Sequence, residues 1–127
     1  MPTYTMEHIH LFSKDAIAAG KFYTDTFGVE VKEVKTSEGL PLCYIRLGGL
    51  IVLISTVEGD MQEMAADHTR QLGINHFALR VEDLDAVHED LTAKGIEFTV
   101  EPKEIPGARI AFIQGPDRVN IEFVQYT

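Results

Sequence analysis

Two histidines near the N-terminus, His8 and His10, lie two positions apart in the stretch "MEHIHLFSKD", which otherwise alternates like a β-strand. A third histidine, His76, opens the similar stretch "HFALRVEDLD", and Glu122 interrupts the apolar strand "NIEFVQ" near the C-terminus. Imidazole and carboxylate groups bind divalent metal ions and also transfer protons near neutral pH. These residue types therefore suggest a metal site or an acid–base site, provided that the fold brings them together.

An internal repeat relates two of these histidines. His8 and His76 are separated by the same number of residues as Asp15 and Asp83. In each copy the histidine is followed by alternating apolar residues, the acidic residue, a helical stretch, a glycine and a strand. Repeats of this kind indicate that one structural module occurs twice. Each copy predicts the element order βαβββ, and the whole chain an α+β fold of two such modules, each with a curled mixed sheet.

The predicted elements follow from apolar periodicity and from capping signals. Helices are expected at about 15–27 and 83–94, with Gly28 and Gly95 placed to end them. The predicted strands cover residues 5–12, 29–36, 41–47 and 50–56 in the first module, and 74–81, 96–101, 108–114 and 119–126 in the second. The stretch "GPD" is expected to turn between the last two strands.

The segment between the modules predicts a helix rather than a flexible linker. Asp60 and Glu63 have the spacing of a capping box. Several residues after them share one helical stripe, namely Met61, Met64, Ala65, His68 and Leu72. The expected organisation is a single domain, with one module at about 1–57, a connecting helix at about 58–73 and a second module at about 74–127.

The charge and cysteine content of the chain limit the kinds of molecule that it is expected to bind. The 127 residues include 20 acidic and 11 basic side chains, for a net charge of −9, which disfavours binding to nucleic acid or to an anionic membrane. Cys43 is the single cysteine, so no internal disulfide can form. The sequence has neither a signal-peptide pattern nor a long apolar run, and we expect a cytoplasmic protein whose partner is a small-molecule substrate.

Aligning the last strands of the two modules, "LIVLIS" with "NIEFVQ", pairs Val52 with Glu122. The repeat then defines four equivalent positions, of which His8, His76 and Glu122 can bind a metal. If the first and last strands of each module line one trough, these three side chains converge. Two imidazoles and a carboxylate would cap one side of an octahedral cation and leave positions for water or substrate. Left buried and unpaired, each would cost about 1–3 kcal/mol, so a shared cation is the economical interpretation.

Further candidates share strand faces with these residues. His10 has the same strand parity as His8, which suits a second acid–base group, although hydrogen bonding at the rim of the trough would also explain it. Tyr44, Arg46 and Arg80 could orient an anionic or carbonyl substrate, with solvation of the rim as the alternative. Cys43 has the opposite parity to Tyr44 and is expected to be an unreactive core thiol.

The motifs "HIHLFSKD", "KFYTDTFG", "NHFALRVEDLDA", "LTAKGIEF" and "AFIQGPDRVNIEF" together resemble the vicinal oxygen chelate superfamily. That superfamily includes glyoxalase I, methylmalonyl-CoA epimerase, fosfomycin-resistance transferases, extradiol dioxygenases and bleomycin-resistance proteins. The resemblance implies paired modules around a metal-lined cleft, with His8, His76 and Glu122 as ligands of one Zn²⁺, Ni²⁺, Mn²⁺, Co²⁺ or Fe²⁺ ion. It also implies a homodimer. Val52 stands where glyoxalase I and the epimerase carry a fourth ligand.

The leading functional hypothesis is therefore a glyoxalase-like enzyme of the lyase or isomerase type that chelates a substrate through two neighbouring oxygens. In it, Glu122 or His10 would move the proton. One alternative is an Fe(II)-dependent ring-cleaving dioxygenase. Phe112 argues against it, because extradiol enzymes tend to carry an acid–base tyrosine at this place. The other alternative is a metal-free protein of the bleomycin-resistance type, which the pair of histidines disfavours.

Overall fold

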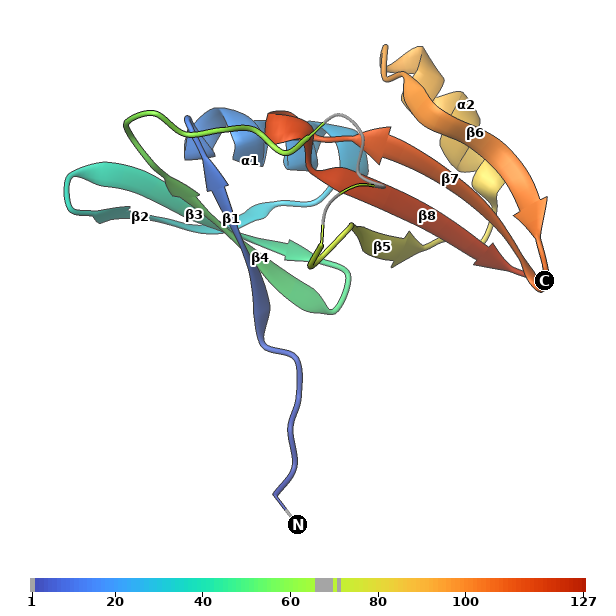
Figure 1. The fold of residues 1–127 in the computed structure, drawn as a ribbon, viewed down its shortest axis with the longest axis horizontal. Coiled ribbons are helices and arrows are strands. Elements are labelled where there is room, and N and C mark those ends of the chain that lie inside the picture. The colour runs from blue at the N-terminus through green and yellow to red at the C-terminus, as the bar shows by residue number, and fades with distance from the viewer. Residues whose placement is uncertain (1, 66–69, 71) are drawn as a thin grey trace. The chain divides into compact units, whose positions relative to one another are not determined.

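The computed structural model describes residues 2–65, 70 and 72–127. The chain forms two compact units, which we call unit 1 (Met1–Gln62) and unit 2 (Glu63–Thr127) and describe separately (Figure 1). In each unit a strand and a helix precede three further strands. The predicted α+β class and the repeated βαβββ order are therefore confirmed.

Unit 1 contains one helix and a mixed sheet of four strands. Its elements are β1 (His8–Ser13), α1 (Ala16–Phe27), β2 (Val31–Ser37), β3 (Leu40–Leu47) and β4 (Leu50–Thr56). The strand order is β1-β4-β3-β2, in which β1 runs parallel to β4 and the other pairs are antiparallel. The first and last strands of the module thus lie side by side.

Unit 2 repeats this arrangement. Its elements are β5 (Phe77–Arg80), α2 (Leu84–Ala93), β6 (Phe98–Ile105), β7 (Ala108–Gln114) and β8 (Asn120–Tyr126). The strand order is β5-β8-β7-β6, and again only the first and last strands of the module pair in parallel. Side chains near the start of β5 are therefore placed beside those of β8.

The helix boundaries are set by capping residues that can be recognised in the sequence. The carboxylates of Asp15 and Asp83 each accept a hydrogen bond from the backbone N–H three residues on, at 3.0 and 3.1 Å. After the helices, Gly28 and Gly95 have φ angles of 66° and 82°, which a residue without a side chain adopts at no steric cost. In the described part of the chain, neither helix has the length and apolar character needed to cross a bilayer.

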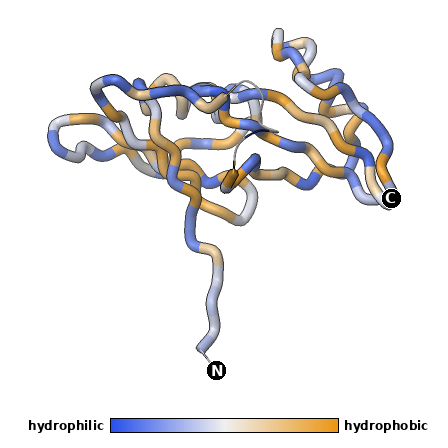
Figure 2. Tube along the Cα trace, in the orientation of Figure 1, coloured by the Kyte–Doolittle hydropathy of each residue, from blue (hydrophilic) through white to orange (hydrophobic). Residues whose placement is uncertain are grey.

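Each helix covers one face of its own sheet, and the hydrophobic stretches in Figure 2 follow the strands of both sheets. In unit 1 the buried side chains beneath α1 belong to alternate residues of β3 and β4, namely Cys43, Ile45, Leu47, Val52 and Ile54. In unit 2 those beneath α2 are Ala111, Ile113, Ile121 and Phe123. Since strand side chains alternate, the residues between them point to the other face of each sheet.

The predicted connecting helix is wrong over residues 58–65, where no helical turn forms. Gly59 has a φ of 100°, outside the helical region, and its carbonyl accepts a hydrogen bond from the backbone N–H of Met61 at 2.9 Å. This tight turn lies at the place where the capping box was expected to start the helix. His68, the fourth member of the predicted stripe, lies outside the described residues.

The turn between β7 and β8 forms at the predicted place, but no glycine occupies its two positions with a positive φ angle. Residues Pro116–Arg118 make a short 3₁₀ turn, η2. Asp117 and Arg118 have φ angles of 61° and 60°, in the left-handed region. Aspartate tolerates this conformation better than arginine does, so the backbone is strained chiefly at Arg118.

Candidate metal centre

His76 and Glu122 are neighbours in unit 2. Ala78 on β5 is the register partner of Glu122 on β8, and His76 precedes Ala78 by two residues, so all three side chains lie on the sheet face opposite α2. The Nε2 atom of His76 is 3.2 Å from Oε1 of Glu122, and the two side chains are 31% and 15% exposed. The structure thus places two of the three predicted ligands together.

The separation of these two atoms suits a shared cation. Nitrogen and oxygen ligands bind a transition-metal ion at about 2.1 Å, so two of them on one ion lie roughly 3.0–3.4 Å apart. The ring of Phe112 packs edge-on against that of His76, with centroids 5.1 Å apart, and restricts its orientation. Imidazole and carboxylate together suit the divalent ions expected from the sequence.

In unit 1, His8 and His10 lie on the sheet face opposite α1, with ring centroids 6.4 Å apart. The Nδ1 atom of His8 is 2.9 Å from Oε1 of Glu7, and the Nε2 atom of His10 is 2.7 Å from Oγ of Ser55 on β4. Both histidines therefore have one ring nitrogen held by an oxygen. In neither unit do three His, Cys, Asp or Glu side chains cluster within the described residues. His8 belongs to unit 1, and His76 and Glu122 belong to unit 2.

The pairing of Val52 with Glu122 in the repeat is wrong by one residue. Val52 is 2% exposed and faces α1. In the antiparallel ladders Glu122 is opposite Phe112, and the corresponding pair in unit 1 is Leu53 opposite Tyr44. Leu53 is therefore the structural equivalent of Glu122, and an apolar side chain still occupies the fourth position.

The three predicted substrate-binding residues lie on the same sheet faces as the histidines. Tyr44 and Arg46 share the open face of β3, and Arg46 is exposed. The ammonium of Lys35 lies 5.7 Å from the ring centre of Tyr44. In unit 2 the guanidinium of Arg80 lies over the ring of Tyr126, at 5.0 Å. Each face thus carries a cation held against an aromatic ring.

Cys43 does not belong to either face. Its side chain is 1% exposed beneath α1, and its Sγ atom contacts the carbonyl of Ala16 at 3.4 Å. Burial raises the pKa of this thiol, because the thiolate would lose its hydration. The structure agrees with the prediction of a core thiol.

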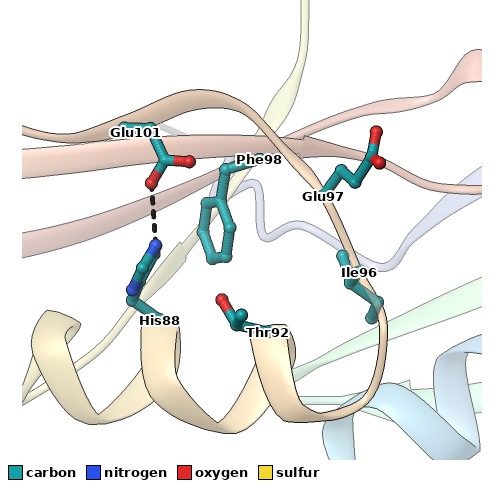
Figure 3. Close-up of a pocket in the computed structure, with 6 residues that line it drawn as sticks. All are labelled: His88, Thr92, Ile96, Glu97, Phe98 and Glu101. Carbon is teal, nitrogen blue, oxygen red and sulfur yellow. Dashed lines mark hydrogen bonds and ion pairs between the residues drawn. The ribbon is translucent and has the colours of Figure 1, made fainter.

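A second feature of unit 2 is a cavity of about 400 Å³ on the other side of the sheet, between α2 and β6 (Figure 3). His88 on α2 reaches across to Glu101 on β6, with Nε2 and Oε2 2.7 Å apart, and its ring lies 4.8 Å from that of Phe98. These polar groups bind one another and tie the helix to the edge strand. We therefore assign His88 to packing.

Four residues near the histidines escaped the sequence analysis: Glu7, Ser55, Asn75 and Asn120. Asn75 Oδ1 is 2.7 Å from Nδ1 of His76, and the Nδ2 atom of buried Asn120 is 3.3 Å from the same oxygen. Glu7 and Asn75 each directly precede a histidine of the repeat, so the repeat itself could have revealed them. Ser55 and Asn120 are defined only by strand pairing across long separations in sequence.

A family profile and a curated relative both match the chain over most of its length. The sequence profile of the "Glyoxalase/Bleomycin resistance protein/Dioxygenase superfamily" matches residues 5–123. A "Probable lactoylglutathione lyase" of Vibrio cholerae is 26% identical over 133 residues, covering 98% of this chain and 93% of the relative.

Solved structures share the fold. A glyoxylase/bleomycin resistance protein/dioxygenase domain from Frankia sp. EAN1pec superposes with a TM-score of 0.80 at 22% identity, covering 99% of this chain and 94% of that one. A mutant of the fosfomycin resistance protein FosX from Listeria monocytogenes, complexed with Mn(II) and a dihydroxypropylphosphonic acid, has a TM-score of 0.76 at 23% identity. The coverage is 99% of this chain and 95% of that one.

Proposed function

The chain belongs to the glyoxalase/bleomycin resistance protein/dioxygenase superfamily, and from that premise we propose that it is a divalent-metal-dependent enzyme of the glyoxalase type. The observation that carries the proposal is the pairing of His76 Nε2 with Glu122 Oε1 at 3.2 Å on an open sheet face. The relative named as a probable lactoylglutathione lyase supports lyase or isomerase chemistry. The Mn(II) complex of the fosfomycin resistance protein supports the use of a metal.

In this proposal His8, His76 and Glu122 hold one Zn²⁺, Ni²⁺, Mn²⁺, Co²⁺ or Fe²⁺ ion. When bound, the ion supplies Lewis acidity toward two neighbouring oxygens of a small substrate. His8 is the first residue of β1, and His76 directly precedes β5. The carboxylate of Glu122 adds negative charge, which would favour a dication over a neutral ligand. Leu53, at the place of a fourth ligand, has no donor atom and would leave the set at three protein ligands.

The chain's own residues would then bind the substrate and move its proton. His10 and Glu122 are the proposed proton carriers, and Ser55 keeps the Nε2 edge of His10 in place at 2.7 Å. Tyr44, Arg46 and Arg80 are proposed to orient the substrate, the arginines by pairing with its anionic or carbonyl groups. A homodimer is part of the same proposal, and light scattering of the purified protein tests it directly.

The experiment that tests this function is elemental analysis of untagged protein purified without chelator. The wild type is compared with His76→Ala and with the control His88→Gln, which alters a histidine on the opposite side of the unit 2 sheet. Each divalent ion is also added in turn while the melting temperature is recorded, because a ligand that binds only the folded state stabilises it.

We expect stoichiometric metal in the wild type and in His88→Gln, and its loss in His76→Ala. That result would justify a screen of 2-oxoaldehydes with glutathione, acyl-CoA epimers and catechols, of which oxygen uptake on a catechol would reassign the enzyme as a dioxygenase. Absence of metal, together with no thermal stabilisation by any ion, would reject the proposal and favour a metal-free binding protein.

A further inference from the structure

A chain of three polar side chains in unit 2 ends at the imidazole of His76. The Nδ2 atom of Asn120, a residue only 7% exposed, lies 3.5 Å from the backbone carbonyl of Asn75 and 3.3 Å from its Oδ1. The same Oδ1 lies 2.7 Å from Nδ1 of His76. Asn75 therefore bridges a buried amide and the candidate ligand.

The backbone carbonyl of Asn75 determines which group donates and which accepts in each of these hydrogen bonds. A backbone carbonyl only accepts hydrogen bonds, so the end of the Asn120 amide that faces it is the NH₂ group. That NH₂ also faces the side chain of Asn75, whose nearest atom must then be its oxygen. An amide oxygen only accepts as well, so the bond to His76 requires a proton on Nδ1.

This assignment decides which nitrogen is available to a metal. A neutral imidazole protonated at Nδ1 carries its lone pair on Nε2, which faces a carboxylate oxygen of Glu122 at 3.2 Å. Two lone pairs at this distance repel each other unless a cation lies within reach of both. We infer that Asn75, anchored by Asn120, is a positioning residue that fixes the His76 tautomer so that Nε2 is presented to the metal. The inference rests on the proposed metal-dependent function.

In unit 1, Nδ1 of His8 also has an oxygen partner from the preceding residue, but this partner is more exposed. Glu7 directly precedes His8, as Asn75 precedes His76, and its carboxylate lies 2.9 Å from Nδ1 of His8. Its side chain is 77% exposed, whereas Asn75 is anchored by a buried amide. An oxygen partner on the second ring nitrogen is the usual way in which proteins orient a ligating histidine. The repeat has thus placed such a partner beside both histidines.

The test uses full-length metal-free protein and long-range ¹H–¹⁵N correlation spectra of the histidine rings, at a pH where they are neutral. We expect the wild type to show His76 protonated at Nδ1. Asn75→Ala should shift the ring toward the other tautomer, in which Nε2–H donates to Glu122, and should weaken Ni²⁺ and Mn²⁺ binding by roughly 10–100-fold in calorimetric titrations. Asn75→Asp, which keeps the acceptor oxygen, should retain both properties.

Two results would overturn the inference: an Nε2-protonated His76 in the wild type, or an Asn75→Ala protein with unchanged tautomer and unchanged metal affinity. The spectra are recorded without metal, so they remain informative if the wild type binds none. In that case the proposed function fails on the calorimetric titration, while the tautomer of His76 still tests the role of Asn75.

Discussion

Leu53 and Glu122 occupy equivalent places in the two sheets, so the same backbone position presents an isobutyl group in unit 1 and a carboxylate in unit 2. Each faces an aromatic residue across the antiparallel ladder, Tyr44 in one unit and Phe112 in the other. The scaffold is therefore repeated, while the side chain at this position differs between the two copies.

Leu53→Glu should add a ligand to the proposed site. Leu53 is half-buried on the open face, so the substitution should change the free energy of unfolding by less than about 1 kcal/mol. An added carboxylate should tighten the binding of Mn²⁺ or Ni²⁺ at least about tenfold, or roughly 1.4 kcal/mol. Calorimetric titration measures the affinity, and urea unfolding measures the stability.

Val52→Glu is the matched control for the strand register. Val52 is 2% exposed beneath α1, so a carboxylate there would be buried without a partner and should destabilise unit 1 by several kcal/mol. If Val52→Glu were tolerated and improved metal binding while Leu53→Glu unfolded the protein, the assigned equivalence of Leu53 and Glu122 would be wrong.

Gly20→Ala should destabilise the protein although alanine favours helices. A Cβ atom at Gly20 would lie 2.8 Å from Sγ of Cys43, closer than packed atoms approach. The overpacking cost of about 1–3 kcal/mol outweighs the gain of up to about 1 kcal/mol in helix propensity. The urea midpoint should therefore fall.

The same substitution should reverse its effect when the sulfur is absent. In a Cys43→Ala background the nearest remaining contact of the new Cβ is Cδ1 of Ile45, at an ordinary 3.7 Å. There, Gly20→Ala should be neutral or stabilising, and the double-mutant cycle gives the coupling. Equal destabilisation in both backgrounds would mean that the contact with the Cys43 sulfur is not the cause of the destabilisation by Gly20→Ala.

Arg118→Gly should raise the free energy of unfolding by about 1 kcal/mol. Arg118 is exposed and has a φ of 60°, and glycine removes the steric cost of this left-handed conformation, partly offset by the greater entropy of the unfolded chain. Asp117→Gly should gain less, because aspartate tolerates this region better. A loss of stability in Arg118→Gly would show that the arginine side chain holds the turn.

Stability should respond to acid through Asp85. A hydrogen bond from the Arg109 guanidinium and the attraction of its charge hold the pKa of this carboxyl below its ordinary value. The native state therefore binds fewer protons here than the unfolded chain, so the contribution is present above pH about 4 and is lost as the pH falls through the lowered value. Urea midpoints of wild type and Asp85→Asn should differ at pH 6 and converge as the pH falls below the lowered pKa of Asp85.

Arg109→Gln separates the ion pair from the helix terminus. Asp85 also lies in the first turn of α2, where a negative charge is favourable in itself. If the ion pair causes the pKa shift, Arg109→Gln should reduce the acid sensitivity nearly as far as Asp85→Asn does. A variant that keeps the full acid response of the wild type would assign the effect to the helix instead.

The repeated architecture was predictable because its signals are local. Asp15 and Asp83 cap the helices, and Gly28 and Gly95 end them, as their positions in sequence require. Most strands followed from alternation of apolar and polar residues, and "LIVLIS" from its short apolar run. The closeness of His76 and Glu122 was also predictable, since the parallel pairing of first and last strands is the natural closure of a βαβββ module.

The errors arose where the sequence carries no marker of register. The run "LIVLIS" is apolar throughout its first five residues, so its periodicity fits Val52 or Leu53 equally well on the open face, and only the pairing with β1 decides. The capping-box pattern at Asp60 was outweighed by the positive φ of Gly59. The contact of Asn120 with Asn75 joins residues that sequence periodicity cannot relate.

The repeated βαβββ order also has a consequence for protein engineering. Each framework position exists twice, once in each unit, so a side chain can be changed in one unit while its counterpart in the other stays as it is. Leu53 is such a position, half-buried on the open face of its sheet, where a polar side chain would not disturb the buried core. A single substitution there would therefore alter the chemistry of one sheet face and leave the scaffold unchanged.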